Sequence, residues 1–118
     1  MGTILSAADE VEALKLEYEV FQEERKKDFE SQRASLYDKY AAAIRRRQVS
    51  FQNQGNLEQV IQAKSEADLA EEKRTHGEAE FPGSKELRET LLASLAKIDE
   101  AEVTETEKLR QRYIHLAK

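Results

Sequence analysis

The sequence predicts an all-α protein, an elongated antiparallel coiled-coil-like arrangement with a long helix, a short return helix and a third long helix. Three observations lead to this prediction. Apolar residues recur at the spacing of helices and do not alternate as they do in strands. One Pro and four Gly in 118 residues leave few positions for turns. Charged residues make up 36% of the chain with a formal net charge of only -5, which fits helices with narrow apolar seams and solvated faces.

The first helix is expected over residues 7–53. Ser6 followed by Asp9 resembles a helix-opening cap, with the acidic side chain near the positive end of the helix dipole. No Gly or Pro follows before Asn53, and a helix this long, about 70 Å, is ordinary for a coiled coil. Its apolar residues step first by about 3.5 and then by about 3.67 residues. They are Val11, Leu14, Tyr18, Phe21, Phe29, Leu36, Tyr40, Ile44 and Phe51.

The sharpest local signal in the chain is a hairpin turn at Gly55 and Asn56. Glycine can take the left-handed conformation that closes a helix. Asn56 is then a good N-cap for the next helix, with Gln59 at the capping-box position. We therefore predict a second helix over residues 57–76 that runs antiparallel to the first.

A linker over residues 77–84 and a third helix over residues 85–117 follow. Pro82 disfavours helix at the residue before it, and Ser84 is suited to cap the third helix. An apolar stripe at Leu87, Leu91, Leu95 and Ile98 supports this third helix.

The direction of the third helix depends on charge. We expect it to turn after the linker and run parallel to the first helix, because this places the acidic residues 99–107 level with Arg45–Arg47. Surface charge pairs contribute little each, so the opposite direction stays open as the alternative. In the up-down-up arrangement the predicted main apolar cluster comprises Leu36, Tyr40, Ile44, Phe51, Val60, Ile61, Leu87, Leu91, Leu95 and Ile98.

The domain organisation allows two interpretations. The length suits one elongated helical domain over residues 1–118. A Leu-x-x-x-Tyr spacing occurs at Leu36 and Tyr40 and again at Leu109 and Tyr113. If this is an internal repeat, the chain is a fragment of a larger repeat protein; if it is a coincidence between two amphipathic helices, the single domain stands.

Residues 30–72 resemble a group of uncharacterised bacterial coiled-coil repeat and spacer proteins, in which long helices run into a Gly-Asp-Leu or Gly-Asn-Leu hairpin turn. The matching residues are Gly55-Asn56-Leu57, followed by Val60, Ile61 and Ala63. The resemblance implies a spacer or scaffold segment of larger, often exported proteins. It implies no catalytic, cofactor or ligand residues.

Other chemistry is poorly supported by the sequence. His76 and His115 lie far apart, and there is no Cys, so we expect no metal site or cofactor. The basic runs at Arg25–Lys27 and Arg45–Arg47 encircle their helix and form no continuous basic face, which argues against nucleic-acid or lipid binding. No catalytic arrangement is apparent, and no apolar stretch is long enough to span a membrane. The sequence does not indicate a cellular location.

The function predicted from these features is a non-enzymatic structural, spacer or self-assembly coiled-coil module. The alternative is a helical adaptor that binds a partner protein's helix through an exposed apolar seam. If the third helix leaves the first half of the first helix uncovered, that half presents an apolar stripe to water, and a homodimer is the simplest remedy. The predicted self-association interface is Val11, Leu14, Tyr18, Phe21 and Phe29.

Overall fold

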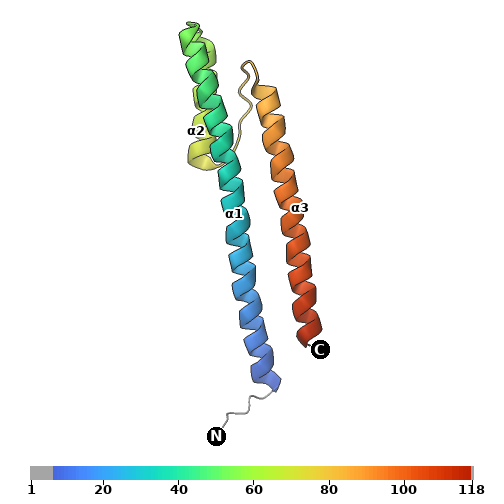
Figure 1. The fold of residues 1–118 in the computed structure, drawn as a ribbon. Helices are drawn as coiled ribbons and strands as arrows, with labels where there is room; N and C mark the ends of the chain where they lie inside the picture. Colours follow the sequence, from blue (N-terminus) through green and yellow to red (C-terminus); the bar gives the residue numbers. More distant parts are fainter. Residues whose placement is uncertain (1–6, 118) are drawn as a thin grey trace. The chain divides into compact units, whose positions relative to one another are not determined.

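A computed structural model describes residues 7–117 of the chain, so Ser6 of the predicted first cap lies outside the described residues. The described part is all-α. Its helices are α1 (Ala7–Asn53), α2 (Leu57–Lys73) and α3 (Ser84–Ala117), which Figure 1 shows in order from blue to red. The predicted bounds of the first and third helices agree with α1 and α3 to within one residue, whereas the second helix was predicted three residues too long.

The hairpin turn between α1 and α2 is confirmed. Gly55 has a φ of +72°, the left-handed conformation that closes α1. The Asn56 side chain accepts a hydrogen bond of 3.3 Å from the backbone N–H of Gln59, so Asn56 is the N-cap of α2. The caps at this turn are local, which is why the sequence alone predicts it.

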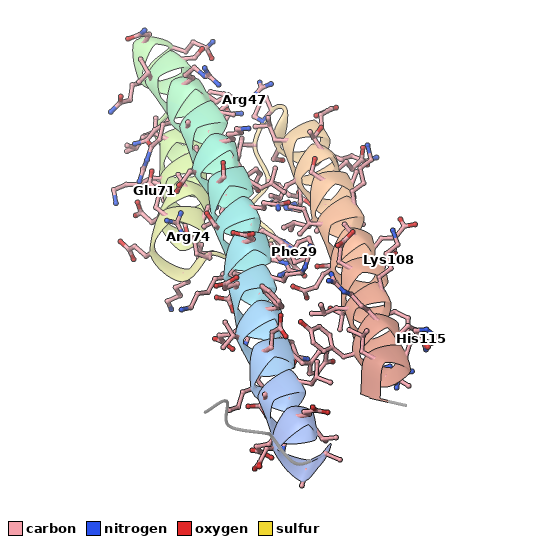
Figure 2. The ribbon with its side chains drawn as sticks, turned by 60° about the horizontal axis from the view of Figure 1, so that its bottom comes forward. Phe29, Arg47, Glu71, Arg74, Lys108 and His115 are labelled. Carbon is pink, nitrogen blue, oxygen red and sulfur yellow. The ribbon has the colours of Figure 1, made fainter. Side chains whose placement is uncertain are left out.

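The end of α2 differs from the prediction. The helix ends at Lys73 and not at residue 76, and its C-cap Arg74 takes the left-handed conformation with a φ of 49°. The guanidinium of Arg74 also pairs with Asp38 of α1, which favours this ending although arginine rarely adopts a positive φ. Figure 2 shows Arg74 at the end of α2.

Contacts divide the chain into two compact units, which are described separately. Over the described residues, unit 1 comprises residues 7–30 and 99–117, and unit 2 comprises residues 31–98. In unit 2, α2 packs antiparallel to α1, since Arg45 pairs with Asp68 while the earlier residue Asp38 pairs with the later residue Arg74.

In unit 2 the third helix is also antiparallel to α1, so the predicted parallel direction is wrong. The reason is the linker of residues 74–83. It leaves α2 beside Asp38 and reaches the level of Arg47 and Phe51, where Arg47 donates a hydrogen bond of 3.2 Å to the carbonyl of Pro82. The linker therefore returns the chain towards the hairpin end of α1 before α3 begins (Figure 1).

The core of unit 2 is built largely from alanine on the α2 side. Leu91, Tyr40, Ile44 and Phe51 are buried as predicted, but Ile61 is 56% exposed and its predicted place in the core is wrong. The buried face of α2 carries small residues that allow α1 to approach closely. The buried cluster is Tyr40, Ala41, Ile44, Phe51, Ala63, Ala67, Ala70, Phe81 and Leu91, with Leu36, Tyr37, Val60, Ala79, Leu87 and Leu95 packed against it; Ile98 is outside it.

The beginning of α3 is held by the loop before it. Ser84 is buried, and its hydroxyl accepts a hydrogen bond of 3.2 Å from the backbone N–H of Phe81. The first helical bond of α3 runs from the N–H of Leu87 to the carbonyl of Gly83. Ser84 thus secures the loop and does not act as the predicted N-cap.

Unit 1 is an antiparallel pair formed by the first half of α1 and the second half of α3. Tyr18 and Tyr113 lie with ring centroids 5.3 Å apart, and Arg25 pairs with Glu105 at 2.8 Å. The acidic run of α3 therefore meets Arg25, and its predicted level beside Arg45–Arg47 is wrong. Because α3 covers part of α1 here, the first half of α1 is not an isolated helix.

Candidate functional site

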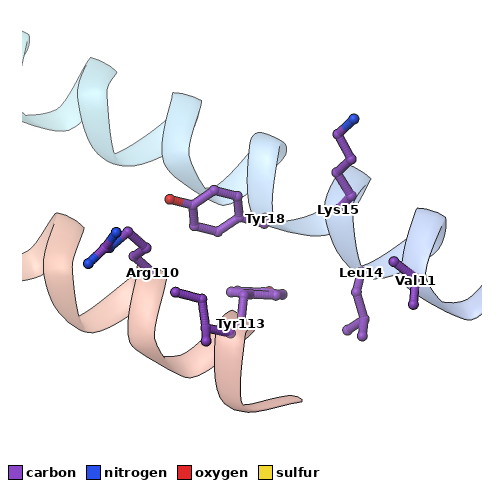
Figure 3. A pocket seen from close by; sticks show the side chains of 7 residues that line it. Val11, Leu14, Lys15, Tyr18, Arg110 and Tyr113 are labelled. Atoms are coloured by element: carbon purple, nitrogen blue, oxygen red, sulfur yellow. The ribbon is translucent and has the colours of Figure 1, made fainter. Parts of the chain in front are cut away.

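An open apolar groove lies between α1 and α3 in unit 1 (Figure 3). Its volume is about 450 Å³. Figure 3 shows Tyr18 beside Tyr113 in the groove and the amine of Lys15 pointing away from α3. The groove is lined by Val11, Leu14, Lys15, Tyr18, Arg110, Tyr113 and Ile114.

The structure brings together three of the five predicted interface residues. Val11, Leu14 and Tyr18 line the groove. Phe21 is 38% exposed and contacts the Tyr113 ring at a centroid distance of 6.5 Å. Phe29 is buried and is therefore part of the packing of unit 1, not of its surface.

The α3 side of the groove was not predicted. In the sequence Tyr113 was noted only in the Leu-x-x-x-Tyr spacing with Leu109, and the expected parallel direction of α3 placed it away from Tyr18. Burial raises the pKa of the Tyr113 hydroxyl, and the negative charge of Glu17 raises it further. Tyr113 is thus neutral where it lines the groove.

Unit 1 buries few of its large apolar side chains. Among its described residues, Phe29, Leu109 and Tyr113 are buried. A larger set is exposed: Val11, Leu16, Val20, Phe21, Val103, Ile114 and Leu116. A pair of helices buries only a narrow apolar seam, and this balance leaves unit 1 with exposed apolar surface.

A second, smaller hollow of about 190 Å³ lies further along the same two helices in unit 1. It is lined by Gln22, Arg25, Lys26, Phe29, Glu102, Thr106 and Leu109. Val11, Lys15, Gln22 and Lys26 are spaced by four, seven and four residues, which places them on one stripe of α1. The apolar groove is therefore followed along α1 by a region that carries Arg25 and Lys26.

Unit 2 contains a buried polar cluster that the sequence analysis missed. Glu66 is fully buried, at 0% exposure. One carboxylate oxygen accepts hydrogen bonds from the Tyr40 hydroxyl at 2.5 Å and from Arg88 at 3.0 Å. The other accepts one from the backbone N–H of Gly77 at 2.7 Å. The signal for this cluster was present, since Glu66 shares the inward face of α2 with Ala63 and Ala70.

The electrostatics of this cluster keep Tyr40 neutral and Arg88 charged. Burial, the hydrogen bond to Glu66 and the charge of Glu66 raise the pKa of Tyr40, while Arg88 partly opposes this. Desolvation lowers the pKa of Arg88, but its contacts with Glu66 outweigh this and the net shift is upward. The Nε of Arg88 is buried with no hydrogen-bond partner among the described residues. The arrangement is a paired charge inside a helical core.

Two arginines of the basic run Arg45–Arg47 of α1 form hydrogen bonds within unit 2. Arg45 donates to Asp68 at 2.6 Å and to Glu71 at 3.0 Å, and these hydrogen bonds raise the pKa of Arg45. Arg47 is engaged with the carbonyl of Pro82. These contacts explain two of the three consecutive arginines as packing residues between helices.

Comparison with protein-family models, with curated proteins and with solved structures finds no match to this chain. Within residues 7–117, no group of three or more His, Cys, Asp and Glu side chains is placed to hold a metal ion. None of the described helices is long and apolar enough to cross a membrane. The open apolar groove of unit 1, at which Val11 and Ile114 are partly exposed, is the candidate functional site.

Proposed function

We propose that this protein is a non-enzymatic helical self-assembly module, and that the groove of unit 1 receives unit 1 of a second copy. The observation that carries the proposal is the open apolar groove of about 450 Å³ in unit 1, at which Val11 and Ile114 are 50% and 41% exposed. Two such helix pairs, packed groove to groove, would form a four-helix bundle whose core is shared between the copies.

Charge supports an antiparallel pairing of the two copies. The first turn of α1 carries Asp9 and Glu10, whereas Arg25 and Lys26 line the hollow further along the same helix. A two-fold axis near Tyr18 would set the acidic turn of one copy opposite the basic region of the other. A parallel pairing would bring the acidic turns together, which is unfavourable.

Light scattering and sedimentation at tens of micromolar test this proposal. We expect the wild-type mass to be twice 13.6 kDa, and Val11→Glu/Ile114→Glu to be monomeric, because the carboxylates would be buried in the shared core. Both side chains are half-exposed within one copy, at 50% and 41%, so the substitutions should leave the fold of the single chain intact.

Leu16→Glu/Val20→Glu is the matched control. These side chains are each 55% exposed on α1 but do not line the groove, so this variant should remain dimeric. A monomeric wild type would overturn the proposal and favour the adaptor, whose groove takes a helix of another protein. A dimer that persists in Val11→Glu/Ile114→Glu would overturn the groove as its interface.

A further inference from the structure

We propose that Glu66 and Arg88 act as a clamp on the linker of residues 74–83, that this clamp sets the antiparallel direction of α3, and that it keeps α3 paired with α1 of its own chain. The clamp spans three parts of unit 2. Glu66 comes from α2, Arg88 from α3, and the groups that they hold belong to the backbone of the linker between these helices.

The clamp binds the linker at two backbone groups. Glu66 accepts the N–H of Gly77 at 2.7 Å, and Arg88 donates to the carbonyl of Ala79 at 2.8 Å. The two side chains are joined by their own ion pair of 3.0 Å. An extended segment has no hydrogen bonds of its own, so these side chains supply partners that a neighbouring strand would otherwise provide.

Gly77 allows this close approach. A Cβ at this position would lie 2.7 Å from a Glu66 carboxylate oxygen and 3.0 Å from a Leu69 methyl carbon. The glycine is therefore required by the space beside the carboxylate. Any larger residue would push the linker and the Glu66 carboxylate apart.

The linker also has little slack. It starts beside Asp38, and Phe81 near its end packs edge-on against Phe51 at a centroid distance of 6.1 Å. The corresponding distance along α1 is about 20 Å at 1.5 Å per residue. The chain from Arg74 to Phe81 can span at most about 25 Å. A linker held in this extended path can deliver α3 only at the hairpin end of α1.

The clamp is better suited to selecting one arrangement than to adding stability. Buried ion pairs are often replaced by apolar residues without loss of stability, because desolvation offsets their attraction. Here the unpartnered Nε of Arg88 adds to that desolvation. A released linker would let the apolar stripe of α3 pair with α1 of a second copy, as in domain swapping.

Cross-linking between α1 and α3 tests the clamp. The chain has no cysteine, so Arg25→Cys/Glu105→Cys, at the ion pair of unit 1, gives one thiol on each helix. The Val11→Glu/Ile114→Glu background removes association through the groove. A short bismaleimide then yields an intramolecular product when α3 pairs within its chain, and a dimer on a denaturing gel when α3 is exchanged.

Two variants break the clamp in different ways. Glu66→Leu/Arg88→Leu replaces the charges with apolar side chains, and Gly77→Ala keeps every charge but displaces the linker. In both we expect helical circular dichroism close to that of the parent, a several-fold loss of the intramolecular product and a matching rise of the dimer. The control Arg45→Leu/Asp68→Leu removes an ion pair of 2.6 Å between α1 and α2 that touches no linker atom, and it should keep the parental ratio.

The proposal fails if the folded variants keep the parental ratio of products. If Glu66→Leu/Arg88→Leu loses its helical signal, the ratio of cross-linked products in Gly77→Ala alone tests the proposal. Loss of helix in both variants would also overturn the proposal, since the cluster would then be required for folding itself and would not select the direction of α3.

Discussion

The Tyr40 hydroxyl donates a hydrogen bond of 2.5 Å to the Glu66 carboxylate, which is fully buried and lies 26 residues later in the chain. This bond joins α1 to α2 beside the linker. A buried carboxylate is tolerated only when its oxygens are satisfied. Tyr40 therefore belongs both to the apolar core and to the polar cluster of unit 2.

Alkaline titration should reveal this contact. The pKa of Tyr40 in the folded protein is above its ordinary value of 10.0 because of burial and the neighbouring Glu66. The unfolded chain therefore loses this proton first, and stability falls as the pH rises above about 10. Tyrosinate absorbance should contain a late-titrating component, which Tyr40→Phe should reduce; the raised pKa of Tyr113 accounts for the remainder. A Tyr40→Phe titration identical to that of the wild type would contradict the assignment.

Removing one partner of the buried pair should be strongly destabilising. Glu66→Ala leaves the partly buried Arg88 guanidinium without its counter-charge and the Gly77 N–H without its acceptor, and we expect a loss of about 3–5 kcal/mol in the free energy of unfolding. Urea denaturation followed by circular dichroism measures it. The exposed pair of Arg110 and Glu107 supplies the comparison, because Glu107→Ala should leave stability nearly unchanged. Equal effects would argue against a buried charge at Glu66.

The core assignment of α2 and α3 can be tested with a matched pair of truncations. Leu91 is 3% exposed and Ile61 is 56% exposed. Leu91→Ala should therefore lower the free energy of unfolding by about 2–5 kcal/mol, whereas Ile61→Ala should change it by about 0.5 kcal/mol or less. A larger effect at Ile61 would place that face of α2 in an interface.

The hairpin turn should be sensitive to backbone strain alone. An added Cβ at Gly55 would meet no atom within 4 Å, but the φ of +72° disfavours branched side chains. Gly55→Val should cost about 1 kcal/mol or more. Gly55→Asn should cost less, since asparagine tolerates this conformation. Equal urea midpoints for the two variants would show that the turn has relaxed to another conformation.

Acid should weaken the α1–α2 contact through Asp68. Hydrogen bonds from Lys64 and Arg45 hold the pKa of Asp68 below its ordinary value of 3.8. The unfolded chain therefore takes up this proton first, so the stabilisation is present above pH 3.8 and is lost as the pH falls through the lower folded value. Asp68→Asn should reduce the pH dependence of the urea midpoint in this range. An unchanged dependence would show that the pair contributes nothing in solution.

The sequence predicted those parts of the fold that depend on neighbouring residues. The turn at Gly55 and Asn56 follows from capping by these two residues, and the length of α1 follows from the absence of Gly and Pro within it. Both effects act within a few residues. The direction of α3 could not be predicted in this way, because it depends on contacts between Glu66 and Gly77 and between Arg88 and Ala79. These are contacts between separate elements.

The site was predicted in part for a related reason. The spacing of Val11, Leu14 and Tyr18 placed them on one apolar face, and all three line the groove. Phe29 has the same spacing, but it faces α3 and is buried. The bulky Ile61 was assigned to the core over the neighbouring alanines, because hydrophobicity alone does not reveal that α1 and α2 approach closely enough to exclude large side chains.

The antiparallel pairing of Tyr18 with Tyr113 also determines how the protein would respond to mechanical force. Tension applied to the first turns of α1 and the last turns of α3 would act perpendicular to the two helices of unit 1. It would separate them one turn after another, starting from these ends. Such peeling breaks few contacts at a time, so unit 1 should yield at low force. The load would reach the buried bonds of Glu66 only after unit 1 had opened, and these bonds would give a second, higher step in a force–extension curve.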